Sequence, residues 1–244
     1  MQPLLEPDYA NQFSDLIFDL DDTLMDTTGQ LVVPAAREAC EAMILAGLDA
    51  DLEICIEERA RLFAASPRED LYGNLVSHFG VKPGSCPEAV RLAGVRAFFH
   101  REVETNIQPF DRVPQLLETL MDHYGLHLVT SGSPQTQQQK IDILGLDGFF
   151  KSVYLVHPEM GQTKAEAFAK ILEKEDLEPS RVLCIGDRVD REIKAANALG
   201  MATCHVHYGE FHHLEPEEPH EIPDFRISHI RELSSRLGKP LIEL

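Results

Sequence analysis

The sequence has few basic side chains for its size. Its 244 residues include 22 Lys and Arg against 41 Asp and Glu, which gives a formal net charge of -19. Because phosphate contacts require basic side chains, this imbalance argues against DNA, RNA or an anionic membrane surface as the main partner. An anionic substrate would also be repelled, so a site for one would need a local cation or a metal.

Long apolar runs and paired cysteines are absent as well. The sequence has no run of about 18 apolar residues, which excludes a transmembrane helix. The first residues, MQPLLEPDYANQF, lack the basic and apolar regions of a signal peptide, so none is expected. The five cysteines are scattered and form no CxxC pair, which favours free thiols in a reducing cytoplasm. We therefore expect a cytoplasmic protein, and leave open whether it forms a homodimer.

Short apolar runs alternate with helical patterns along most of the chain. Continuous apolar runs of this length are typical of strands that are buried on both faces of a parallel sheet. They are LIFDL at 16–20, LHLVT at 126–130, SVYLV at 152–156, RVLCI at 181–185 and, more weakly, ATCHVH at 202–207. The helical patterns between them predict βαβ units, so we expect an α/β fold with a Rossmann-like parallel sheet core.

The segment 26–105 interrupts this alternation, because it contains helical patterns and no strand signal. The expected helices begin at Pro34, at a capping box over Ser66–Glu69, and at residue 87. We expect a helical domain over residues 26–105, inserted into a core domain formed by 1–25 and 106–244. An insertion directly after the first strand would lie above the carboxyl ends of the strands, where open α/β sheets bind ligands.

Acidic residues follow two of the expected strands. Asp19 and Asp21 lie two residues apart at the end of the first strand, so both can point to one side. Two carboxylates that close are costly to keep ionised without a nearby cation, and a hard divalent ion, Mg²⁺ by availability, meets this need. A second acidic site is Asp187, with Asp190 and Glu192 after it, behind the RVLCI strand.

Other polar residues fall at the same edge of the expected sheet. Thr130, Ser131 and Gly132 end the LHLVT run, and Lys164 opens the helix after SVYLV. This convergence of polar groups at the carboxyl ends of several strands is stronger evidence for an active site than any one motif alone.

These residues resemble the motifs of the haloacid dehalogenase (HAD) superfamily. FDLDDTL at 18–24 is similar to its first motif, DxDxT; Thr130 matches the second, Lys164 the third, and Asp187 with a following acid the fourth. The resemblance covers roughly residues 14–25 and 107–210, and the helical insertion resembles the C1-type cap of the family. Within the superfamily the chain looks like a phosphatase of the broad phosphoglycolate-phosphatase-like group.

The resemblance implies a hydrolase, a Mg²⁺-dependent phosphatase that acts on a small phosphorylated metabolite. Asp19 would attack phosphorus and become an aspartyl phosphate, while Asp21 would protonate the leaving alcohol and then accept a proton from water. Thr130 and Lys164 would hold the phosphoryl oxygens, and the backbone N–H of Ser131 could face them too.

The resemblance also implies the metal ligands, which are Asp19, the backbone carbonyl of Asp21, Asp187 and Glu192. In the family, the fourth motif usually ends in an Asp four or five places after its first Asp. Here the fifth place holds Glu192 and the third holds Asp190. We favour Glu192 as the metal support and expect Asp190 to be a helix N-cap, and the choice between them stays open.

Other functions are compatible with the same residues. A sugar phosphomutase of this superfamily uses the same set. A phospho-accepting regulatory module also combines acids, Thr or Ser and Lys at strand ends, but it lacks the helical insertion. A binding protein with a relic site is a further alternative. Asp21 weighs against a 2-haloacid dehalogenase, which needs no acid for an alcohol leaving group.

Two other groups of residues have no assigned role. Five histidines near Cys204 could bind zinc, but their spacing matches no standard site, and a solvated acidic loop is the alternative. They are His205, His207, His212, His213 and His220. Five arginines of the helical insertion are candidate substrate contacts, without a basis for choosing among them. They are Arg59, Arg61, Arg68, Arg96 and Arg101.

Overall fold

The computed structural model of the chain describes residues 11–66, 69–99 and 106–239. The chain divides into two compact units, which we call the core unit (Met1–Asp26 and Thr105–Leu244) and the helical unit (Thr27–Glu104). Across the described ranges, no helix is both long enough and apolar enough to cross a membrane.

The core unit is built on a six-stranded parallel sheet with the strand order β3-β2-β1-β4-β5-β6. The strands are β1 (Asp15–Phe18), β2 (Gly125–Ser131), β3 (Ser152–Val156), β4 (Val182–Gly186), β5 (Ala202–Val206) and β6 (Phe225–Ile227). The chain moves outward from β1 to β3 and then resumes on the other side of β1 with β4. This reversal of direction is the switch point at which open α/β sheets bind ligands. The expected α/β core with a parallel sheet is confirmed.

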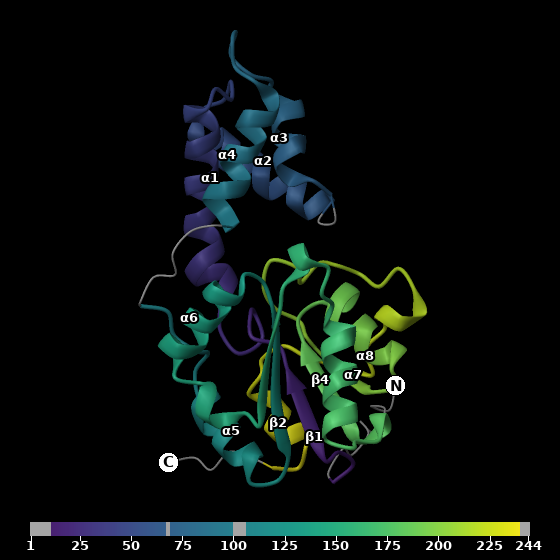
Figure 1. Cartoon of the computed structure of the whole chain (residues 1–244). Helices are drawn as coiled ribbons and strands as arrows, with labels where there is room; N and C mark the ends of the chain where they lie inside the picture. Colours follow the sequence, from purple (N-terminus) through teal and green to yellow (C-terminus); the bar gives the residue numbers. More distant parts are fainter. Residues whose placement is uncertain (1–10, 67–68, 100–105, 240–244) are drawn as a thin grey trace, which may run out of the picture. The chain divides into compact units, whose positions relative to one another are not determined.

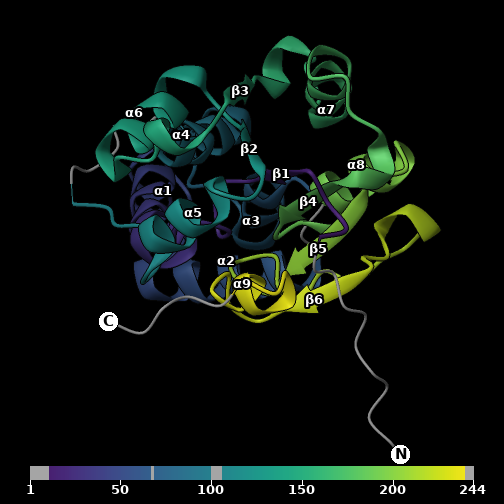
Figure 2. The same cartoon turned by 90° about the horizontal axis from the view of Figure 1, so that it is seen from below.

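Helices cover both faces of the sheet (Figures 1 and 2). Helices α5 (Val113–Met121) and α6 (Pro134–Leu144) lie on one face, and α7 (Lys164–Lys174) and α8 (Lys194–Ala198) on the other. Because both faces are covered, β1 is buried at every position, which is why it reads as a continuous apolar run. The remaining helical segments of the core unit are η2 (Asp147–Phe149), η3 (Pro158–Met160), η4 (Pro179–Arg181), η5 (Val189–Ile193), η6 (Pro219–Glu221) and α9 (Glu232–Arg236).

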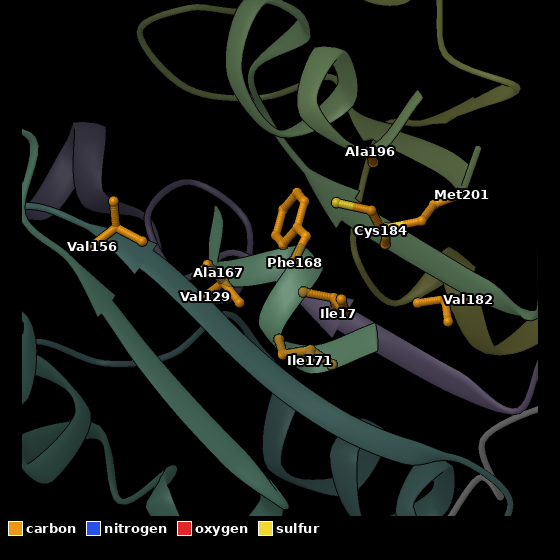
Figure 3. Close-up of a cluster of buried hydrophobic side chains, with 10 residues drawn as sticks. All are labelled: Ile17, Val129, Val156, Ala167, Phe168, Ile171, Val182, Cys184, Ala196 and Met201. Atoms are coloured by element: carbon orange, nitrogen blue, oxygen red, sulfur yellow. The ribbon is translucent and has the colours of Figure 1, made fainter. Parts of the chain in front are cut away.

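One apolar cluster joins α7 and α8 to the sheet (Figure 3). Its members are Ile17, Val129, Val156, Ala167, Phe168, Ile171, Val182, Cys184, Ala196 and Met201. Phe168 of α7 belongs to this cluster together with Ile17 of β1, and it is almost fully buried. Lys164 lies one turn before Phe168 on the same helix, so this packing also holds Lys164 near the end of β1.

In its described residues, the helical unit contains four α-helices: α1 (Val33–Leu45), α2 (Leu52–Ala65), α3 (Leu71–Phe79) and α4 (Pro87–Phe99). Helix α1 continues from η1 (Thr28–Val32), and Pro34 lies in its first turn, as expected. Helix α2 was not expected; it begins after Asp51, whose carboxylate accepts hydrogen bonds from two backbone N–H groups of its first turn. The capping box expected at Ser66 is wrong, because α3 begins after Asp70, which caps the N–H of Gly73. Residues 67 and 68 lie outside the described ranges.

The arginines of the helical unit have different environments. Arg59 is buried, with its guanidinium 4.9 Å from the ring centre of Phe98. Arg61 is exposed and forms an ion pair with Glu58, and Arg96 is exposed. Arg68 and Arg101 lie outside the described residues.

Three polar side chains from β1, β2 and β3 meet at the amino ends of these strands. His127, fully buried, pairs with Asp15 through Nε2 (3.2 Å) and with the hydroxyl of Ser152 through Nδ1 (2.8 Å). Burial opposes ionisation of Asp15, but hydrogen bonds from His127 and Ser14 and the charge of Lys151 together lower the pKa of Asp15. The ionised Asp15 therefore stabilises the folded chain.

We expect Asp15→Asn to be less stable than the wild type at pH 7, and the difference to shrink in acid. A carboxyl whose pKa is lower in the folded state contributes stability above its unfolded pKa of about 3.9 and loses it as the pH falls through the folded pKa. Urea unfolding at pH 7, 5 and 3 measures this difference, with the exposed Asp111→Asn as the matched control. A difference between Asp15→Asn and wild type that is constant with pH would contradict it.

Candidate active site

Asp19 comes directly after β1, at the carboxyl edge of the sheet. Its backbone N–H donates to the carbonyl of Ile185 in β4 (2.9 Å), which ties it to the switch point between β1 and β4. The Asp19 residue is 6% exposed. Its carboxylate oxygen Oδ1 lies 2.7 Å from Nζ of Lys164. A buried carboxylate thus faces a buried ammonium at the place where the fold binds ligands.

Lys164 is the first residue of α7, and a capping box formed by Thr163 and Glu166 fixes the start of this helix. Its ammonium forms ion pairs with Asp19 and with Glu192. Burial opposes the charge of Lys164, but the two carboxylates raise its pKa, so the side chain stays protonated. Lys164 therefore places a buried positive charge beside Asp19 in a strongly acidic chain.

Three buried carboxylates meet beside Lys164. Ligand atoms of Asp19, Asp187 and Glu192 all lie within 4.8 Å of one another. Burial, together with the charge of Glu192 and other neighbours, raises the pKa of Asp19 to about 7 and raises that of Asp187 well above its usual value. Lys164 can balance the negative charge of only one of the three acids. The donor set therefore fits a hard divalent cation, whose charge would favour the ionised form of all three acids.

Glu192 reaches this cluster from η5. One of its oxygens accepts a hydrogen bond from the backbone N–H of Arg188 (3.2 Å). A Cβ on Gly186 would lie 2.7 Å from Cγ of Glu192, so the approach of the glutamate depends on the missing side chain at 186. Asp190, expected to be a helix N-cap, instead forms a two-fold ion pair with the Arg188 guanidinium (2.9 and 2.7 Å). That expectation is wrong, because Arg188 takes up both oxygens.

The structure brings Asp21 and Thr130 together through helix α6. Gln137 donates from Nε2 to Oδ2 of Asp21 (2.8 Å) and to the hydroxyl oxygen of Thr130. Lys140 donates to the other oxygen of Asp21 (2.7 Å). Ser131 ends β2 next to Thr130 and is half-buried. Gln137 and Lys140 could not be identified from the sequence, because they lie in the polar run QQQK, which is typical of the solvent-exposed face of a helix.

His205 supports Asp187 from β5. Its ring nitrogen Nε2 donates to the backbone carbonyl of Asp187 (2.9 Å), and burial lowers its pKa to about 4, so the ring is neutral. The rings of His205, His207, His212 and His213 follow one another edge to face, with centroids 5.3 to 5.9 Å apart. Among the residues that the structure describes, the only group with metal-ligand geometry is Asp19, Asp187 and Glu192.

The chain is similar in sequence to a family of hydrolases and to curated phosphatases. A model of haloacid dehalogenase-like hydrolases matches residues 16–206. The chain is 32% identical over 225 residues to the glyceraldehyde 3-phosphate phosphatase of Methanopyrus kandleri, covering 89% of this chain and 94% of that protein. It is 27% identical over 232 residues to the phosphoglycolate phosphatase of Vibrio parahaemolyticus, covering 89% and 93%.

A solved structure shows the same fold. The HAD-hydrolase YfnB of Bacillus subtilis, solved with bound magnesium, superimposes with a TM-score of 0.64 and 21% sequence identity. The match covers 93% of this chain and all of that one. Because the compared proteins are matched over nearly their whole lengths, the likeness extends to the chain as a whole.

Proposed function

The chain belongs to the haloacid dehalogenase-like hydrolase family and is a phosphatase of small phosphorylated metabolites, and from this premise we propose that it works through a phosphorylated Asp19. The observation that carries this proposal is the placement of a buried Asp19 carboxylate 2.7 Å from the Lys164 ammonium, inside a cluster of acids. Phosphoryl transfer needs a positioned nucleophile and positive charge around the moving phosphoryl group, and little other help.

Asp19 attacks phosphorus through a carboxylate oxygen, and the bond between phosphorus and the alcohol oxygen breaks. Water then attacks the aspartyl phosphate, which releases inorganic phosphate and restores Asp19. Lys164 offsets the charge that the phosphoryl oxygens bring to the buried site, and Thr130 contributes a hydroxyl donor. The backbone N–H of Ser131 is a further donor at the end of the same strand.

Asp21 transfers a proton in both steps. It gives a proton to the leaving alcohol in the first step and takes one from the attacking water in the second. Its position two residues after Asp19 puts it on the same edge of the sheet, and its side chain is 27% exposed, so it can exchange protons with solvent.

Mg²⁺ is the metal that we assign to the buried acids. Asp19, Asp187 and Glu192 would hold it with their carboxylates, and Asp21 with its backbone carbonyl. When bound, it supplies positive charge that offsets the negative charge of the acids and of the substrate phosphate. Both carboxylate oxygens of Asp190 accept hydrogen bonds from the Arg188 guanidinium. This ion pair supports the choice of Glu192, rather than Asp190, as the last metal ligand.

The substrate that we propose is a short-chain phosphate ester such as glyceraldehyde 3-phosphate or phosphoglycolate. The support is the identity with two phosphatases named for these compounds, matched over more than nine-tenths of their lengths. The segment 26–105 would act as the cap domain, because it is inserted a few residues after Asp19 in the chain.

A panel of phosphate esters tests this substrate class. We expect kcat/KM for two- and three-carbon esters to exceed that for hexose phosphates and nucleotides by about 10-fold or more, because the larger groups must be accommodated at the same site. Phosphate release with Mg²⁺ and with chelator is the measurement. A best substrate among nucleotides would contradict the proposed class, and isomerised sugar phosphate in place of free phosphate would favour a phosphomutase.

A further inference from the structure

Helix α6 contributes two donors to the general acid proposed above, Asp21. Lys140 Nζ lies 2.7 Å from Oδ1 of Asp21, and Gln137 Nε2 lies 2.8 Å from Oδ2. Residues three apart on a helix share one face, so both donors reach Asp21 from the same side. Both oxygens of the carboxylate are therefore held by one rigid element.

The two donors are themselves fixed. The Lys140 side chain is 8% exposed and Gln137 is 2% exposed, although both sit in a polar run of the sequence. A buried ammonium is stable only when it is paired, and here its partner is the Asp21 carboxylate. Lys140 thus differs from a solvated lysine, which would sample many positions and leave Asp21 free to rotate.

Gln137 also connects Asp21 to Thr130. Its Nε2 group donates to the Thr130 hydroxyl oxygen as well as to Asp21. A hydroxyl has one hydrogen to donate, and because its oxygen already accepts from Gln137, that hydrogen remains directed elsewhere. Thr130 is then set to donate to a phosphoryl oxygen. Gly132 leaves space for this contact, since a Cβ there would lie 3.2 Å from the Gln137 side chain.

We propose that Lys140 is a positioning residue that holds the carboxylate of Asp21 toward the leaving alcohol, with Gln137 fixing Asp21 and Thr130 relative to each other. The inference rests on the proposed function, because it concerns how its acid is oriented. Lys140 itself does not bind the phosphate, since its ammonium is buried against Asp21.

The leaving group of the substrate separates this role from a purely structural one. An alkyl phosphate releases a basic alkoxide and needs Asp21 as an acid, whereas an aryl phosphate such as p-nitrophenyl phosphate releases a stable phenolate. The value of kcat/KM reports the steps up to the first irreversible one, here the transfer of the phosphoryl group to Asp19. Loss of acid orientation should therefore lower kcat/KM for alkyl esters alone.

We expect Lys140→Met to lower kcat/KM for glyceraldehyde 3-phosphate by about 10- to 100-fold, the loss that a misplaced reacting group produces. For p-nitrophenyl phosphate we expect kcat/KM to change by less than about 3-fold, with a burst of phenolate because water activation is slowed. Lys140→Arg should restore part of the alkyl rate. In a variant that already carries Asp21→Asn, Lys140→Met should not lower kcat/KM for glyceraldehyde 3-phosphate any further.

The matched control is Lys170→Met on the exposed face of α7, which should behave as wild type with both esters. Equal losses with both esters, or no loss with either, would overturn the positioning role. If Asp19→Asn is inactive in the same assays, the proposed function survives that result. If Asp19→Asn turns over like wild type, the proposed function and the positioning role both fall.

Discussion

Asp19→Asn is expected to lower turnover by about 10⁴-fold or more, the scale seen when an enzyme loses its covalent nucleophile. The amide has the shape of the carboxylate but no negative charge, so it cannot attack phosphorus. It also removes one of the three clustered acids. Steady-state phosphate release with Mg²⁺ present measures the effect, and thermal unfolding shows that the variant is folded.

Asp111→Asn is the control for this substitution. Asp111 is exposed, lies in the core unit and is not one of the clustered acids, so its variant should keep full activity. Residual turnover of Asp19→Asn within ten-fold of wild type would exclude Asp19 as the nucleophile and direct attention to another acid of the cluster.

Asp187→Asn is expected to uncouple the stability of the chain from Mg²⁺. Without Mg²⁺, in the presence of a chelator, the variant should unfold at a temperature several degrees higher than wild type, because it removes a buried acid whose ionisation is opposed by burial and by the neighbouring acids. At this chain length, about 1 kcal/mol corresponds to roughly 2–4 °C. At a free Mg²⁺ concentration of 100 times its Kd, binding should stabilise the folded wild type by about 2.7 kcal/mol and raise its Tm accordingly. The Tm of the variant should rise much less.

The pH dependence gives a second test of the same cluster. The pKa of Asp19 is raised to about 7 in the folded state, above its unfolded value of about 3.9. A group of this kind contributes stability below the unfolded pKa and loses it as the pH rises through the folded pKa. The shift in Tm caused by Mg²⁺ should therefore be larger at pH 8 than at pH 5.5. An equal shift in Asp187→Asn and wild type at both pH values would contradict the assigned metal site.

The fold was predictable where burial leaves a clear pattern in the sequence. The strand LIFDL is covered on both faces and is therefore apolar at nearly every position, and it becomes β1. Strand β6 (Phe225–Ile227) has three residues with an exposed Arg226 in the middle, and nothing distinguishes it from a loop. The acidic residues between β5 and β6 read as a solvated loop, yet Glu221 among them is buried.

Helix α2 was missed for a different reason. Charged residues occur on all sides of Leu52–Ala65, so its apolar stripe is weak, and only the cap residue Asp51 indicates a helix start. The boundary signal at Ser66 was misleading. Asp70 caps α3, and the residue before α5 is Arg112 in a left-handed conformation without a side-chain cap.

The candidate site was predictable where its residues follow strands. Asp19, Thr130 and Asp187 come at the ends of β1, β2 and β4, so the topology alone brings them to one edge of the sheet. Their roles stay predictions. The contacts of Gln137 and Lys140 with Asp21, and of His205 with the Asp187 carbonyl, depend on how a helix and a neighbouring strand pack. The residues next to each of these positions in the sequence do not indicate such contacts.

Chemical trapping of the phosphorylated residue tests the central claim most directly. Asp21→Asn should accumulate the intermediate with p-nitrophenyl phosphate, because the phenolate leaves without an acid while water activation is slow. Acid quench and borohydride reduction convert an aspartyl phosphate to homoserine, which mass spectrometry locates in the peptide chain. We predict homoserine at position 19. Homoserine at another aspartate, or none while phenolate is still released in a burst, would contradict the account.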